Sequence, residues 1–197
     1  NTGNATVTID GYHFGSGVAV RLEDSAQHVV ATGTTCFGNS GRIYATFDLT
    51  GVAPGTYTLV LENPDGSFTS TEFHVAEGQG GGLFARLVMP SLVRLNRPTT
   101  LTIEYGNNGD ADIPSPLLAV SADEGVGLRL FTTEDFSSDP VQIMGLADGH
   151  PAGVWPPPST YRIKMEYQVS AQNWQQFYLK TVSATNQEPM DWDSIEP

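Results

Sequence analysis

Four side chains with oxygen ligands crowd one predicted turn: Asn107, Asn108, Asp110 and Asp112. Hard cations such as Ca²⁺ bind carboxylate and amide oxygens, so this stretch predicts a calcium site. The same residue types also favour tight turns that hold no ion, and the EF-hand pattern is absent. A second acidic pair, Asp191 and Asp193, is a candidate on charge alone.

The three tryptophans are candidate residues for a ligand surface or an interface, because an indole combines a broad apolar face with one N–H donor. Trp155 precedes three prolines and Trp192 lies in the acidic C-terminal stretch, so both are loop-like, while Trp174 is the third candidate. Loops often carry binding residues. For each tryptophan, packing in a core or an interface is the alternative to stacking on a sugar.

Residues for zinc binding or nucleophilic catalysis do not form a motif. The histidines stand apart with no HxxxH spacing, at positions 13, 28, 74 and 150. The turn 38–41 contains a serine but lacks the strand–turn–helix setting of a nucleophile. The many carboxylates leave a glycosidase-type pair open, since spacing in sequence does not give separation in space. We predict a protein that is not an enzyme and has no resident cofactor other than the candidate calcium.

Charge and composition restrict the class of protein. The 197 residues carry 22 Asp+Glu against 9 Lys+Arg, a formal net charge of -13. Nucleic acids and anionic membranes attract clustered basic residues, and we interpret the nearest group, Arg86, Arg94 and Arg97, as solvated. No apolar run approaches the ~20 residues of a membrane-spanning helix. We therefore expect no nucleic acid partner and no membrane insertion.

Cys36 is the single cysteine, so an intrachain disulfide is excluded and we expect a small buried residue there. Charged residues make up only 16% of the chain, beside 21 Gly and 13 Pro. This composition favours an extracellular β-protein. Because the chain starts at Asn1 without a signal peptide, we expect a processed N-terminus or a segment of a longer protein.

Alternation of apolar and polar residues predicts short β-strands along the whole chain. Turn residues such as Pro54 and Gly55 separate the strands, and no amphipathic helix is visible. Regularly punctuated strands of this kind predict a β-sandwich in each half. The predicted strands fall at 5–9, 18–22, 43–47, 57–61, 73–75, 83–89, 99–105, 116–122, 126–131, 140–144, 161–169 and 177–181.

A glycine-rich stretch, 78–82, separates the halves, and its composition predicts a flexible linker. The predicted architecture is all-β, with two tandem immunoglobulin-like β-sandwich domains. These are residues 1–77 and 83–185, followed by an extended acidic tail, 186–197.

The first half resembles the IPT/TIG family of immunoglobulin-like domains over residues 4–75. The run ATFDLTGVAPGTYTLVLENPDG at 45–66 and the run VTIDGYHF at 7–14 are similar to two motifs of that family. In the second half, RPTTLTIEYGNNG at 97–109 resembles CARDB-like bacterial adhesion-type β-sandwich repeats. These motifs are specific for the module and not for a function, and neither family supplies a catalytic set.

Together the resemblances imply a structural and adhesive module of an extracellular bacterial surface or fibre protein. IPT/TIG domains usually have a strand before the VTI strand, and only Asn1-Thr2-Gly3 precede it here. An open sheet edge can accept a strand from another molecule, so head-to-tail assembly of copies into a filament is part of this expectation. The alternatives are a module that binds a surface glycan or protein receptor, and an accessory region of a large secreted protein.

Overall fold

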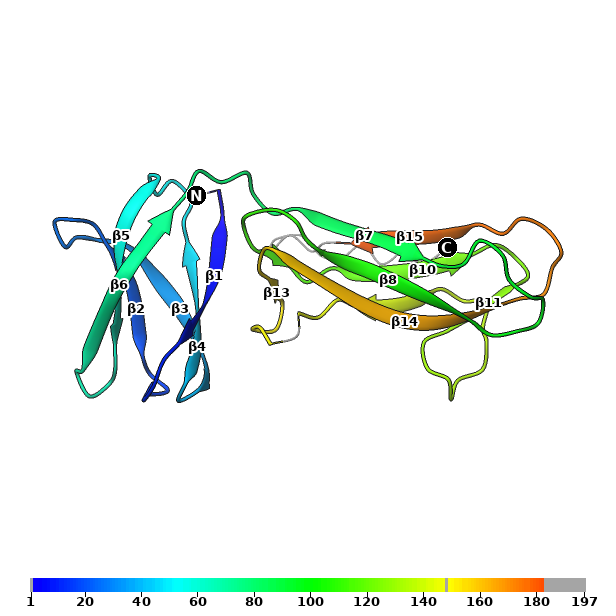
Figure 1. Ribbon diagram of the computed structural model, residues 1–197, viewed down its shortest axis with the longest axis horizontal. Coiled ribbons are helices and arrows are strands. Elements are labelled where there is room, and N and C mark those ends of the chain that lie inside the picture. Colours follow the sequence, from blue (N-terminus) through cyan, green and yellow to red (C-terminus); the bar gives the residue numbers. More distant parts are fainter. Residues whose placement is uncertain (1, 148, 183–197) are drawn as a thin grey trace. The chain divides into compact units, whose positions relative to one another are not determined.

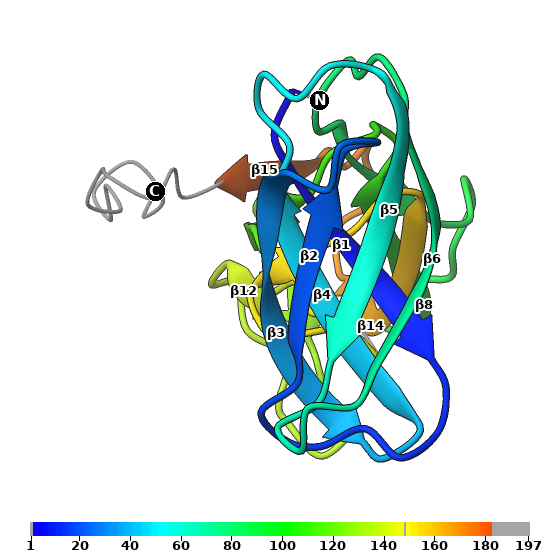
Figure 2. The same cartoon turned by 90° about the vertical axis from the view of Figure 1, so that its left-hand side faces the viewer.

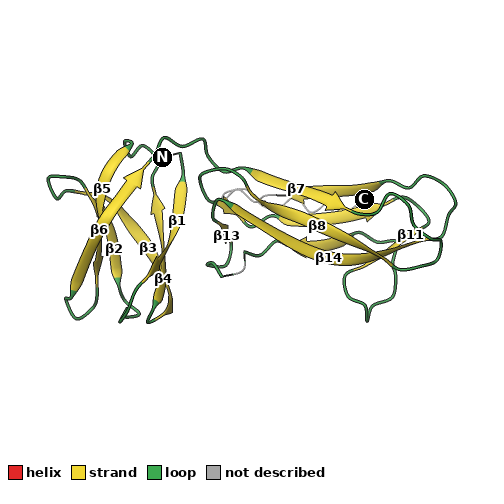
Figure 3. Ribbon diagram, viewed as in Figure 1, coloured by secondary structure: helices red, strands yellow, loops and turns green. Residues whose placement is uncertain are grey.

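The computed structural model describes residues 2–147 and 149–182. Within these ranges the chain forms strands and loops and no helix (Figure 3). The predicted all-β class is confirmed. None of the described residues belongs to a helix that is long and apolar enough to cross a membrane.

The chain divides into two compact units. The first joins residues 1–82 to two later segments, 107–113 and 148–159, and the second contains 83–106, 114–147 and the described residues from 160 onward. The first unit is therefore discontinuous in sequence. The domain boundaries predicted from the glycine stretch stay a prediction.

Six strands in the order β1-β4-β3-β2-β5-β6 build the first unit (Figure 1). They match the predicted alternating runs and add one strand, β3, that the alternation did not indicate. Their bounds are β1 Asn4–Asp10, β2 Ala19–Glu23, β3 Val29–Asn39, β4 Arg42–Asp48, β5 Gly55–Glu62 and β6 Phe68–Val75.

The long strand β3 belongs to both layers of this unit. Its first half pairs antiparallel with β2 and its second half with β4. At the crossing, Gly33 lies against the Phe47 ring, where an added Cβ would come within 3.0 Å of it. Most of β3 is exposed, including Cys36, so the prediction of a buried cysteine is wrong. A strand with little buried surface has no apolar period, which is why the sequence did not indicate it.

One hydrophobic core lies between the two layers of the first unit. Figure 2 shows β2 and β5 in front of β1 and β4, and the buried side chains come from both layers. Phe47 is fully buried at the centre. Burying a side chain of this size contributes about 1.5–3 kcal/mol to folding. The strand members of the core are Val20, Leu22, Ile43, Ala45, Phe47, Leu59, Leu61 and Val75.

The second unit contains a four-stranded sheet, β11-β14-β8-β7, and a three-stranded sheet, β12-β10-β15. A short two-stranded ribbon, β13-β9, is formed by Val154–Trp155 and Ile113–Pro114, and all of it except Pro114 belongs to the first unit. The other bounds are β7 Leu83–Val88, β8 Thr99–Asn107, β10 Leu117–Ala122, β11 Val126–Arg129, β12 Val141–Met144, β14 Ser159–Val169 and β15 Phe177–Val182.

The alternation in β8 and β14 marks the buried face of the four-stranded sheet. Met165 and Tyr167 are almost fully buried, and the Tyr167 ring meets Phe177 of the other sheet edge-on at 5.0 Å. From the three-stranded sheet, Leu118 and Val120 are fully buried as well. The second unit is thus also a two-layer β-sandwich.

A buried carboxylate joins three neighbouring strands of the four-stranded sheet. Glu104 of β8 is only 6% exposed and forms ion pairs with Arg86 of β7 and Arg162 of β14. The hydrogen bonds from Arg162 and Arg86 lower the pKa of Glu104 below its ordinary value. Arg86, interpreted from sequence as a solvated residue, therefore has an exposed side chain whose charge is paired with Glu104.

Candidate functional site

The predicted calcium turn is held by hydrogen bonds within the protein. The side chain of Asn107 is buried, and its Oδ1 accepts from the backbone amides of Gly82 and Gly109, each at 3.0 Å. Its Nδ2 donates to the carbonyl oxygens of Ala111 at 2.8 Å and Trp155 at 2.9 Å. Asn107 thus uses all its hydrogen-bonding capacity to fasten the turn to two other segments.

Asp110 fastens the same turn to the glycine-rich stretch. Its carboxylate accepts from the backbone amides of Gln79 at 2.6 Å and Gly80 at 2.7 Å, and these bonds lower its pKa. A Cβ on Gly109 would come within 2.2 Å of the Gly80 oxygen and 2.4 Å of the Gly82 nitrogen. The glycines therefore allow two backbones to touch, and the flexibility of the stretch 78–82 stays a prediction.

Asp112 lies beside the first strand of the first unit. Its backbone amide donates to the Asn4 oxygen at 2.8 Å, and its Oδ2 accepts from the Thr6 hydroxyl at 2.6 Å. Burial raises the pKa of Asp112, against the hydrogen bonds from Thr6 and the charge of His150. β1 pairs with β4 on its other side, so the β1 edge that the sequence predicts to be open is occupied at Asn4.

Calcium at this turn stays a prediction. Asp110 and Asn107 already accept backbone amides, Asn108 is exposed, and Asp112 Oδ1 has no hydrogen-bond partner among the described residues. Within those residues no group of three or more His, Cys, Asp or Glu side chains could hold a metal ion. The candidate pair Asp191 and Asp193 lies outside the described residues.

The three candidate tryptophans have different environments. Trp155 in β13 is fully buried, so its indole packs in the interior and offers no surface to a ligand. Trp174 is 94% exposed, in the loop between β14 and β15. Trp192 lies outside the described residues. Of the tryptophans that the structure describes, only Trp174 is available to a ligand.

A shallow cleft of about 430 Å³ lies beside Trp174 in the second unit. It is formed by two loops, one between β10 and β11 and the other between β14 and β15, which lie at the same end of this unit (Figure 1). Trp174 stands between two lining residues without lining the cleft itself. The lining residues are Asp123, Glu124, Gly125, Ala171, Asn173 and Gln175.

The two loops hold each other in place through Asp123. Its backbone amide donates to the Gln176 oxygen at 3.0 Å, and its Oδ2 accepts from the Gln176 amide at 2.9 Å. The Tyr178 hydroxyl donates to Asp123 Oδ1 at 3.1 Å, and this bond raises the pKa of Tyr178. Trp174 is therefore carried by a loop that is fixed on its C-terminal side.

Gly125 fixes the N-terminal side of the same loop. Its carbonyl oxygen accepts from the Ser170 amide at 2.8 Å and from the Ser170 hydroxyl at 2.9 Å. Gly125 has a φ of 89°, which favours glycine, and an added Cβ would come within 3.1 Å of the Ala171 side chain. The cleft is thus preformed by backbone contacts on both sides.

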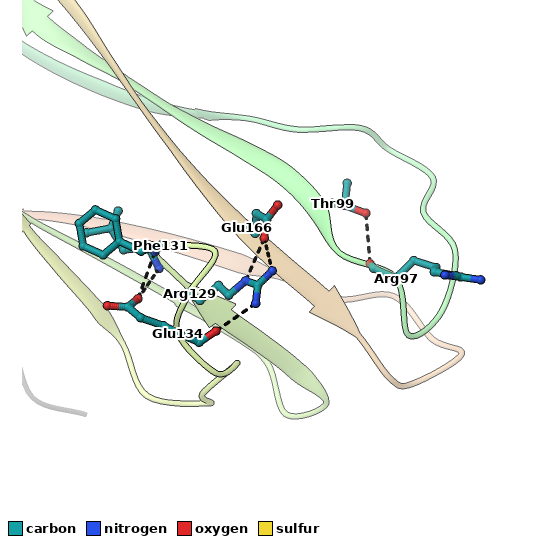
Figure 4. Close-up of polar contacts among 7 residues, drawn as sticks. Arg97, Thr99, Arg129, Phe131, Glu134 and Glu166 are labelled. Atoms are coloured by element: carbon teal, nitrogen blue, oxygen red, sulfur yellow. Dashed lines mark hydrogen bonds and ion pairs between the residues drawn. The ribbon is translucent and has the colours of Figure 1, made fainter.

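A third loop, between β11 and β12, is fixed by Arg129 (Figure 4). The guanidinium donates to Glu166 Oε2 from Nε at 2.8 Å and from Nη2 at 2.5 Å, and to the Glu134 carbonyl at 3.0 Å. It also lies 4.3 Å above the centre of the Phe136 ring. Phe136 lines a second hollow of about 330 Å³. Gly125 and Ser170, which hydrogen-bond to each other beside the first cleft, line this hollow too.

Sequence reasoning named Trp174 and missed the cleft beside it. Asp123, Glu124 and Gly125 lie between two predicted strands, and no local sequence pattern links them to residues 170–178. The signal that was present is Asp-Glu-Gly between two predicted strands, which marks a turn with a positive φ. The cleft offers carboxylates, amides and an adjacent indole, which suit binding of a polar ligand.

The comparisons with known proteins give no family for the chain. No family model matches it, and no curated protein matches it. Among solved structures, the chain is similar to an amphioxus IgVJ-C2 molecule at 8% sequence identity and a TM-score of 0.22, over 93% of this chain and 99% of that one. A score of that size carries no argument about function.

Proposed function

We propose that the chain is a non-catalytic adhesive module of an extracellular bacterial surface or fibre protein, which holds its ligand at the cleft beside Trp174. Two β-sandwiches suit a structural or binding module. The observation that carries the proposal is the 94% exposed indole on a loop that is fixed at both ends. Interfaces concentrate their binding energy in such aromatic side chains.

The fixed loops favour binding on entropic grounds. A ligand that orders flexible side chains or loops loses about 0.5–1.5 kcal/mol for each side chain that it immobilises. The backbone bonds of Asp123 and Gly125 hold the cleft before any ligand arrives. A preformed site of this kind supports adhesion because little binding energy is spent on ordering it.

The test is binding of the labelled full chain to an array of glycans and immobilised extracellular proteins. We expect binding that Trp174→Ala removes. Tyr12→Ala is the matched control, because Tyr12 is an aromatic residue of the first unit with 87% exposure. Absence of binding to every array member, or equal loss in both variants, contradicts the proposal.

Self-assembly is a second candidate, and the open edge at β6 favours it. β6 ends the strand order and pairs with β5 over eight residues, and its residues 68–72 are exposed, including Phe68 at 77%. An exposed edge of low charge can pair with a strand of another molecule. Contact between unlike edges of successive copies would give the head-to-tail filament expected from the sequence.

Light scattering and negative-stain electron microscopy of the full chain test this candidate. We expect assembled species that decrease in Thr71→Lys, which places a charge on the β6 edge. Thr132→Lys is the matched control in an exposed loop of the second unit. A chain that stays monomeric as its concentration rises excludes assembly and leaves the adhesive proposal untouched.

A further inference from the structure

The lining of the cleft beside Trp174 contains a hydrogen-bond acceptor that its own loops do not use. Gln175 Oε1 is buried and has no hydrogen-bond partner among the described residues, while its Nε2 donates to Asn173 Oδ1. Leaving a buried acceptor unpaired costs free energy, because the group loses its bond to water and gains none in the protein. A ligand donor that meets this oxygen after a rotation of the Gln175 side chain would recover that free energy.

The charge of the cleft selects among ligands. Glu124 and Asp123 line it, and its lining contains no Lys, Arg or His. Glu124 is exposed and has no ion-pair partner among the described residues, whereas Asp123 is engaged by Gln176 and Tyr178. An anionic ligand would meet like charge at Glu124. Hydroxyl groups and ammonium groups would meet acceptors instead.

The position of Trp174 outside the lining of the cleft indicates a ligand that extends beyond the cleft. The indole stands next to two lining residues but does not line the cleft, so one small molecule inside the cleft would not use it. An indole face packs well against a flat, weakly polar surface. The carbon-bound hydrogens on one face of a pyranose ring provide such a surface, and a neighbouring ring can then reach the cleft.

We propose that the two loops bind a chain of neutral or amino sugars, with one pyranose on the Trp174 indole and the next one donating hydrogen bonds to Gln175 Oε1 and Glu124. This inference rests on the proposed adhesive function and names its ligand class. It excludes acidic glycans as the preferred ligand. It also assigns separate tasks to Trp174, which supplies apolar contact, and to Gln175, which accepts from the sugar.

Calorimetric titration of the full chain with three pentamers tests the inference: cellopentaose, the chitosan pentamer and pentagalacturonate. We expect the neutral and amino pentamers to bind and pentagalacturonate to bind at least about tenfold more weakly, a difference of about 1.4 kcal/mol. Binding of pentagalacturonate as tight as that of the other two, or binding of none of the three, overturns the inference.

Variants separate the two tasks. Trp174→Ala should weaken both binding pentamers by about tenfold or more, and Trp174→Phe should keep part of the affinity. Gln175→Leu should weaken them, and Glu124→Gln should remove the advantage of the amino pentamer over the neutral one. Unchanged affinity in Trp174→Ala overturns the inference, with Tyr12→Ala as control.

The array experiment distinguishes this inference from the proposed function. If the chain binds an immobilised protein through Trp174 and no glycan, the sugar inference fails while the adhesive function stands. If it binds nothing, both fail.

Discussion

Replacing Asn107 by alanine should lower the free energy of unfolding of the first unit far more than replacing its neighbour Asn108 by alanine. The side chain makes four hydrogen bonds, to Gly82, Gly109, Ala111 and Trp155, and it is 1% exposed. A hydrogen bond contributes about 0.5–1.5 kcal/mol net, and unpaired buried partners add to the loss. Water that enters the space left by the side chain can bond some of these partners and reduce the loss. We therefore expect the free energy of unfolding to fall by about 2–4 kcal/mol.

The matched control is Asn108→Ala, one residue further along. Asn108 is exposed, and a surface substitution of this kind changes stability by about 0.5 kcal/mol or less. The assay is urea denaturation followed by fluorescence in a Trp174→Phe, Trp192→Phe background. In that background the buried Trp155, whose carbonyl accepts from Asn107, is the remaining tryptophan. A loss below about 1 kcal/mol at Asn107, or equal losses at both positions, would refute the reasoning.

Two further predictions concern acid stability and the glycine contact. The stability that Glu104 contributes is present above its unfolded-state pKa and is lost as pH falls through its lowered folded-state pKa. The melting temperature of Glu104→Gln should therefore fall less steeply than that of the unchanged chain as the pH is lowered. An equally steep fall in both contradicts this prediction. Gly109→Ala should lower the free energy of unfolding by about 1–3 kcal/mol, because its Cβ would clash with the Gly80 backbone. Gly55→Ala, whose Cβ would have its nearest neighbour at 3.9 Å, should stay within about 0.5 kcal/mol in the same denaturation assay, and similar losses at the two glycines count against the contact.

Strands with one buried face were predictable and strands without one were not. The alternation of Tyr161 to Val169 marks β14 because Met165, Tyr167 and Val169 face a core. β3 has no such signal, since its half-buried positions hold Ala31, Gly33 and Thr35, which are small or polar, and its other residues are exposed. β13 holds two residues and precedes a run of prolines, so no window could detect it.

The candidate site was predictable only as residue types. Asn107 and Asp110 were found as turn residues, but their distant hydrogen-bond partners lie in the segment 79–82 and at Trp155, and no local pattern encodes such pairing. Trp155 and Trp174 look alike in sequence. Their difference in exposure depends on long-range packing, which periodicity does not report.

The discontinuous first unit constrains how the chain can be synthesised and shortened. Its segment 107–113 is translated after β7 and β8 of the second unit, and its segment 148–159 is translated after β10, β11 and β12 as well. On the ribosome, the six strands of the first unit emerge well before the turn that supplies Asp112 to Asn4 and Thr6. A gene fragment that stops at the glycine stretch would encode those strands without that turn, and its β1 edge would be available to pair with another nascent chain.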